Sequence, residues 1–122
     1  EAEFRAGAAT EALRRLEATD REAIARGQWV WRPGILRAKA AALAAEGDDA
    51  AEACLRESIA VARDQHARSA ELRAATSLAE LLGRKGRRGE ARDLLAPIYG
   101  WFTEGLDTPD LKDAADALAS LA

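Results

Sequence analysis

The single histidine and the single cysteine of this chain are the first candidates for catalysis or metal binding. His66 could act as a general base or a metal ligand, and Cys54 could act as a nucleophilic or redox-active thiol. One residue of each type cannot form a Cys/His zinc site, and one cysteine cannot form an internal disulfide. The local patterns favour structural roles: His66 follows a helical segment where a left-handed backbone would end it, and Cys54 borders a buried stripe. The sequence therefore predicts no catalytic residue, no metal site and no cofactor.

A basic run surrounds Gly86 and is a candidate for binding phosphate or nucleic acid. No aromatic side chain is interleaved for base stacking, and Glu90 and Asp93 dilute the charge. Cations also stabilise the end of a helix, so the pattern favours a solvated turn. The run consists of Arg84, Lys85, Arg87, Arg88 and Arg92.

Two further charged features resemble sites. Asp107, Asp110 and Asp113 have a calcium-loop spacing, but the glycine and the distal glutamate of such loops are missing. Lys39 stands at a core-facing position, where we expect its stem to pack and its ammonium group to reach solvent or a carboxylate, with Glu71 and Glu80 as candidates.

The aromatic residues form two groups. Tyr99, Trp101 and Phe102 could line a ligand pocket, but we expect them to anchor the last helix against the rest of the fold. Of Trp29 and Trp31, we expect one to pack between the first hairpins and the other to be exposed.

The totals limit the class of protein. The 122 residues suit one domain or a short repeat array, with 48% hydrophobic and 32% charged residues. The net charge of −3 provides no general attraction to nucleic acid, and no apolar run is long enough for a membrane span. One cysteine and no disulfide fit a reducing cytoplasm, so we expect a cytoplasmic protein.

Abundant alanine, scarce aromatics and apolar residues at helical spacing predict an all-α fold. Glycines and prolines separate the helical segments, and Gly27, Gly47 and Gly86 mark turns. Pro97 lies inside one segment, where we expect a kink rather than an end. The segments expected are 9–26, 32–46, 50–65, 69–84, one from Arg88 to Gly105, and 109–119 with Asp107 or Thr108 as its cap.

An internal repeat of about 39 residues relates these segments. Leu43 and Leu82 are 39 residues apart, as are Gly47 and Gly86, and Leu55 and Leu95 are 40 apart. A period of this length indicates hairpins that bury their apolar faces against one another. The order of large and small residues between 73 and 107 resembles the tetratricopeptide repeat.

We therefore expect a tetratricopeptide-like array of about two and a half repeats over residues 5–122. The units are a partial hairpin at 9–31, two hairpins at 32–66 and 69–105, and a capping helix at 109–121. Residues 1–4 resemble a remnant of a secretion leader and cloning site, and we leave them out of the domain.

Several stretches together resemble the C-terminal repeat region of large bacterial proteins that join a class III adenylate/guanylate cyclase domain to an AAA-type ATPase domain. They are ELRAATSLA at 71–79, GRRGEAR at 86–92, LAPIYGWFTEG at 95–105 and DTPDLK at 107–112. The chain departs from that pattern at Trp29-Val30-Trp31 and at His66. It carries neither a G-x-x-x-x-G-K-[ST] loop nor paired metal-binding aspartates, so the resemblance implies only a regulatory or protein-binding tail.

Repeat geometry points five side chains into a groove that would bind a protein or an acidic peptide: Arg37, Arg73, Thr76, Glu80 and Arg84. One alternative is a purely architectural segment that packs against other domains of its parent protein. Another is a homodimer through an apolar face of the first helix formed by Leu13, Leu16 and Ile24. A small helical hydrolase or deaminase would need a nucleophile–base pair, which the sequence does not provide.

Overall fold

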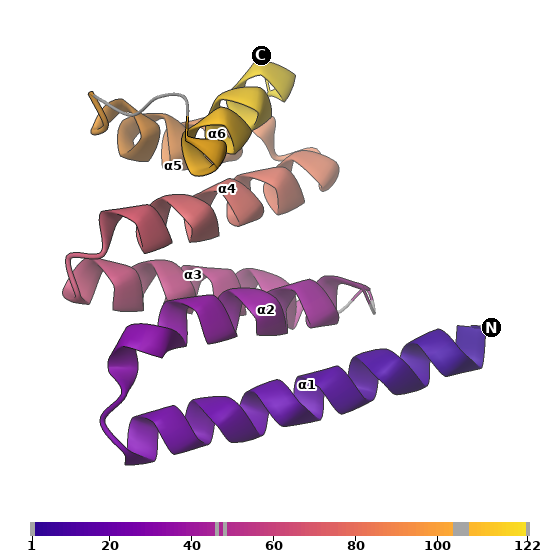
Figure 1. The fold of residues 1–122 in the computed structure, drawn as a ribbon. Helices are drawn as coiled ribbons and strands as arrows, with labels where there is room; N and C mark the ends of the chain where they lie inside the picture. Colours follow the sequence, from indigo (N-terminus) through magenta and orange to yellow (C-terminus); the bar gives the residue numbers. More distant parts are fainter. Residues whose placement is uncertain (1, 46, 48, 104–107, 122) are drawn as a thin grey trace.

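The computed structural model describes residues 2–45, 47, 49–103 and 108–121, and within these it is all-helical, without strands. Six α-helices pack in sequence order as a stack, with the first and last helices at opposite ends (Figure 1). A short 3-10 helix, η1 (Trp29–Trp31), joins the first two. The α-helices are α1 (Ala2–Ala25), α2 (Arg32–Ala45), α3 (Ala50–Asp64), α4 (Arg68–Arg84), α5 (Arg88–Gly100) and α6 (Pro109–Ser120).

The all-α expectation is confirmed, and most predicted helices agree with the structure to within about two residues. The first helix differs, because it begins at Ala2 and includes residues expected to lie outside the domain. The helix predicted to pass through Pro97 does so and ends at Gly100, while Gly105 and Asp107 lie outside the described residues.

Three helix ends share one hydrogen-bond pattern. The amide of Gln28 donates to the carbonyl of Ala23, Ala67 to Ala62, and Arg87 to Leu82, at 2.8–2.9 Å. The residue before each donor has a left-handed backbone: Gly27 (φ 71°), His66 (φ 55°) and Gly86 (φ 80°). This arrangement satisfies carbonyls that the helix leaves free, and it confirms the conformation expected of His66.

Asp49 directly precedes α3 but does not cap it. Its backbone is already helical (φ −64°, ψ −16°), and its side chain makes no capping hydrogen bond. A capping side chain reaches back to the helix when its backbone is extended. Thr108 precedes α6 with an extended backbone, but its hydroxyl does not cap either.

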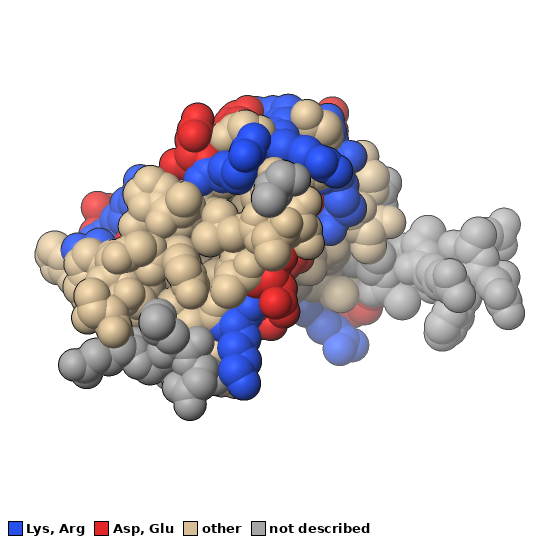
Figure 2. All heavy atoms as spheres, turned by 90° about the horizontal axis from the view of Figure 1, so that it is seen from above, with Lys and Arg blue, Asp and Glu red and all other residues tan. Residues whose placement is uncertain are grey.

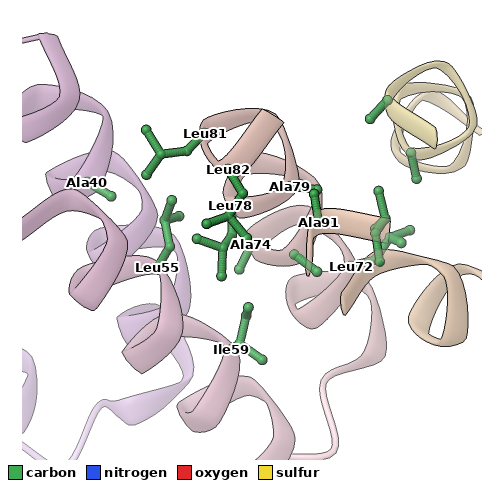
Figure 3. Close-up of a cluster of buried hydrophobic side chains, with 14 of the residues drawn as sticks. Ala40, Leu55, Ile59, Leu72, Ala74, Leu78, Ala79, Leu81, Leu82 and Ala91 are labelled. Carbon is green, nitrogen blue, oxygen red and sulfur yellow. The ribbon is translucent and has the colours of Figure 1, made fainter. Parts of the chain in front are cut away.

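The core lies between α2, α3, α4, α5 and α6 and consists of leucines with alanines between them. Figure 3 shows Leu55 and Ile59 of α3 pointing toward α4. Leu36, Leu72, Leu78, Leu82 and Leu95 are fully buried. Truncation of such a leucine to alanine costs about 2–5 kcal/mol, so these side chains hold the helices together.

The even-numbered helices approach one another, and the odd-numbered ones do not. Within the described residues, α4 packs against α2 and α6 as well as α3 and α5, whereas α3 has no comparable contact with α1 or α5. The stack must therefore curve, with α2, α4 and α6 on its inner side. The spacing supports their equivalence, because Leu43, Leu82 and Leu121 follow one another at intervals of 39 residues and are all buried.

Candidate functional site

Three adjoining cavities lie along the inner side of the stack, and we call them together the inner groove. The first lies between α2 and α4, the second between α4, the start of α5 and α6, and the third connects all three even-numbered helices. Glu80 lines all three cavities, and so joins them into one surface.

Alanine side chains line much of the α2–α4 half of the groove. It has a volume of about 450 Å³ and an alanine-rich floor. Arg37 stands on its wall and donates from Nε to Oγ of Ser77 at 3.2 Å, so this arginine spans from α2 to α4. Arg84 and Glu80 line the α4 side. Small side chains on the floor allow a bound chain to approach the helices closely.

The α4–α6 half is larger, at about 550 Å³, and charged groups of both signs line it. Arg84 ends α4 and Arg88 begins α5, while Asp113 and Asp116 lie one turn apart on α6. Gly83 lets α6 come close to α4: a Cβ there would lie 3.0 Å from Cδ2 of Leu121. The charged groups of this half therefore surround a floor formed by the close packing of α6 against α4.

The connecting cavity of about 220 Å³ is tied together by an ion pair. Nη1 of Arg73 on α4 lies 2.9 Å from Oδ2 of Asp110 on α6. Thr76 is buried, and its hydroxyl donates to the carbonyl of Leu72 in its own helix at 2.8 Å. Thr76 consequently shapes this cavity but offers no free donor.

The structure thus places all five sequence-predicted site residues along one groove, with different roles. Arg37, Glu80 and Arg84 present polar groups to it, Arg73 is held by Asp110, and Thr76 is satisfied internally. The sequence interpretation missed the acidic side chains of α6, because it treated that helix as a cap. A usable signal was present, since Asp116 follows Ser77 by 39 residues and so occupies the equivalent position on its helix.

Comparisons with protein-family models, curated proteins and solved structures found no match for this chain. The geometry of the groove therefore carries the functional argument.

The burial of two charged residues, Arg32 and Glu71, was not predicted from the sequence. Arg32, 7% exposed in its side chain, donates from Nε and Nη2 to both carboxylate oxygens of Asp20 at 2.7 and 3.1 Å. Nη2 also donates to Glu57 at 3.1 Å, and the guanidinium lies over the Trp29 ring at 5.2 Å. The hydrogen bond to Asp20, with that to Glu57, raises the pKa of Arg32.

Glu71 is the counterpart of Arg32, 39 residues further along and equally buried, but with the opposite charge. Arg63 donates to it at 2.7 Å, and Arg68 lies at 3.7 Å. Both buried charges hold an even-numbered helix against the odd-numbered helix beside it. They do not line the groove, so their role is structural.

The basic run around Gly86 divides into paired and unpaired cations. Arg87 bonds Glu52 at 2.7 Å, and Lys85 lies 3.6 Å from Glu52. Hydrogen bonds from Arg87 and then Arg56 hold the pKa of Glu52 at about 2, well below its usual 4.5. Arg84, Arg88 and Arg92 form no ion pair with a described residue, and the first two line the groove.

Several expectations about single residues need correction. Lys39 pairs with Glu17 on α1 at 3.9 Å, and not with Glu71 or Glu80, because its side chain points toward the first helix. Trp29 and Trp31 are both exposed, at 46% and 65%, since Arg32 and Pro33 take the buried positions between the hairpins.

The structure also shows where the second aromatic group and the candidate metal ligands lie. Tyr99 and Phe102 pack against the core, whereas Trp101 is 56% exposed with Arg68 over its ring at 4.6 Å. Cys54 is buried in the core, and no group of three potential ligands is close enough to hold a metal within the described residues. No helix in that part of the chain is long and apolar enough to cross a bilayer.

The apolar face predicted on the first helix is partly covered. Leu13 packs against the core and Leu16 is half-buried, so only Ile24 of the three is exposed, at 41%. The packing of α1 against α2 therefore leaves less of this face open than the sequence predicts.

Proposed function

We propose that this chain is a non-catalytic protein-interaction module, a tetratricopeptide-like array that binds an extended segment of a partner protein in the inner groove. The 39-residue spacing of equivalent leucines and the inner position of the even-numbered helices support a repeat array. The resemblance of residues 71–112 to the tail of cyclase–ATPase proteins supports a regulatory role within a larger cytoplasmic signalling protein.

The observation that carries the proposal is the groove itself, in which three adjoining cavities share polar side chains, some of them without an ion-pair partner among the described residues. Glu80 and Arg84 line the groove and form no ion pair with a described residue, although they lie one turn apart on α4. Arginine binds carboxylates through paired, charge-assisted hydrogen bonds, so Arg37 and Arg84 suit an acidic group of a partner in the α2–α4 half.

A titration with short peptides followed by nuclear magnetic resonance tests this function. The set consists of blocked hexapeptides that are acidic, basic or of mixed charge, and each is added to the isotope-labelled chain. We expect shifts in α2, α4 and α6 for at least one peptide. The Arg37→Ala, Arg84→Ala double variant should weaken an acidic peptide about tenfold, which corresponds to about 1.4 kcal/mol.

Arg21→Ala is the matched control, because Arg21 is an exposed arginine on α1 outside the groove. Shifts confined to other surfaces, or equal losses in the control and the groove variant, would contradict the proposed function.

Exposed hydrophobic side chains favour a second candidate, a segment that packs against other domains of its parent protein. Ile24, Trp29, Val30 and Trp31 lie near one another in sequence and are 41–69% exposed. Replacement of Val30 and Trp31 by serine tests this alternative. It should leave peptide binding unchanged and abolish association with the purified remainder of the parent protein; retained association would exclude this candidate.

A further inference from the structure

We propose that the α4–α6 half of the inner groove selects a partner segment that carries both a carboxylate and a cation. The cation-binding side would be Asp113 and Asp116, and the carboxylate-binding side Arg84 and Arg88. This inference rests on the proposed function and specifies the chemistry of the segment that the groove binds.

The first support is that these four charges share one cavity but form no ion pair within the part of the chain that the structure describes. Arg84, Arg88, Asp113 and Asp116 line the same space of about 550 Å³, and none forms an ion pair with a described residue. Elsewhere the chain pairs its charges readily, as Arg87 and Arg56 do with Glu52 and Glu90. The cavity therefore keeps opposite charges apart across a space that a bound group can fill.

The second support is the position of each charge along the helices. Both arginines flank the turn between α4 and α5, whereas both aspartates project from α6 at a spacing of three residues. Residues three apart on a helix lie on one face, so the two carboxylates act as a pair. The cavity consequently has one cationic wall and one anionic wall.

Glu80 adds to the anionic character in the middle of the groove, where the two halves meet. A purely acidic segment that extended past Arg84 would meet Glu80, Asp113 and Asp116. A purely basic segment would meet Arg84 and Arg88. Like charges brought together in an interface disfavour binding, so only a segment with both signs matches both walls.

The molecular surface at this end of the stack carries charges of both signs. Figure 2 views the stack from the end that carries α5 and α6. Lys and Arg lie beside Asp and Glu along the margins of this face, with an uncharged area between them. The surrounding surface therefore favours neither charge alone.

Titration of the unaltered chain with three blocked hexapeptides tests the inference without any substitution. The peptides have the same length and differ only in charge: one carries two glutamates, one two lysines, and one a glutamate and a lysine three residues apart. We expect the mixed peptide to bind about tenfold more tightly than either of the others. Equal or tighter binding of the acidic peptide would overturn the inference and leave the proposed function standing, whereas no binding by any peptide would overturn both.

Paired variants locate the selectivity. Asp113→Asn with Asp116→Asn should weaken the mixed peptide about tenfold and strengthen the acidic one, and Arg84→Ala with Arg88→Ala should weaken the mixed and acidic peptides. Arg92→Ala with Asp93→Asn is the control, because both residues are exposed on α5 and line none of the three cavities. Affinities that respond to the control pair as strongly as to the groove pairs would place the binding elsewhere and refute the site.

Discussion

Replacement of Arg32 by methionine should lower the free energy of unfolding by about 3 kcal/mol. Methionine keeps much of the length and apolar stem of arginine but removes three hydrogen bonds, two to Asp20 and one to Glu57. Loss of one partner from a buried ion pair commonly costs 3–5 kcal/mol, because the other charge stays buried.

The solvent exposure of Asp20 and Glu57 decides where in the range of about 3–5 kcal/mol the loss of stability falls. Asp20 has a side chain only 14% exposed and would keep most of the penalty, whereas Glu57 is 53% exposed and can recover water. Contact with the Trp29 ring contributes a further ~0.5 kcal/mol. The estimate therefore lies near the lower end, and it corresponds to a fall in Tm of about 10 °C for a chain of this size.

Urea unfolding followed by circular dichroism and tryptophan fluorescence measures this loss. The Arg32→Met, Asp20→Asn double variant should recover part of it, with a coupling energy of about 2 kcal/mol between the two sites. Glu57→Gln serves as the control and should cost less than about 1 kcal/mol. A loss below about 1 kcal/mol for Arg32→Met, or strict additivity in the double variant, would refute the assignment of Arg32 as a structural ion-pair centre.

Three further perturbations follow from single positions. His66→Gly should raise the free energy of unfolding by about 0.5–1 kcal/mol in chemical denaturation, since His66 has φ 55° and glycine adopts that conformation without strain. A lower free energy of unfolding in this variant would contradict the expectation. The pKa of the Glu52 carboxyl is lowered, so its contribution to stability is complete above about pH 4.5 and is lost as the pH falls toward 2. Glu52→Gln should remove about 1 kcal/mol of this pH-dependent stability. An unchanged dependence of the unfolding free energy on pH would exclude this role of Glu52. Gly83→Val should speed amide exchange in α6 by displacing Leu121, while Gly89→Val, where a Cβ meets no atom within 4 Å, should leave α6 unchanged; equal exchange in both variants would disprove close packing at Gly83.

Local signals made the helices predictable from sequence. Gly27, Gly47 and Gly86 all have the left-handed backbone expected of them, and the apolar spacing identified the buried leucines. The helix through Pro97 was also predictable, because its apolar positions continue beyond the proline. These features depend on residues close in the chain, which is why a single sequence reveals them.

The charged contacts were less predictable, because they depend on side chains that meet across helices. Lys39 was expected to reach solvent or a carboxylate, with Glu71 and Glu80 as candidates, but it pairs with Glu17 of α1. Arg32 looked like an ordinary first residue of a helix, and only the packed structure brings Asp20 and Glu57 to it. The mixed charge of the groove was missed because the equivalence of α6 with α2 and α4 was not used.

The opposite signs of Arg32 and Glu71 have a consequence for assembly. Repeats that resemble one another can pair one unit out of place, within one chain or between two chains during folding. If α2 took the place of α4, Arg32 would face Arg63 of α3, and Glu71 in the converse exchange would face Asp20 and Glu57. Each exchange would bring like charges together, so the buried charges of α2 and α4 favour the observed order of the helices, as do the connections between them.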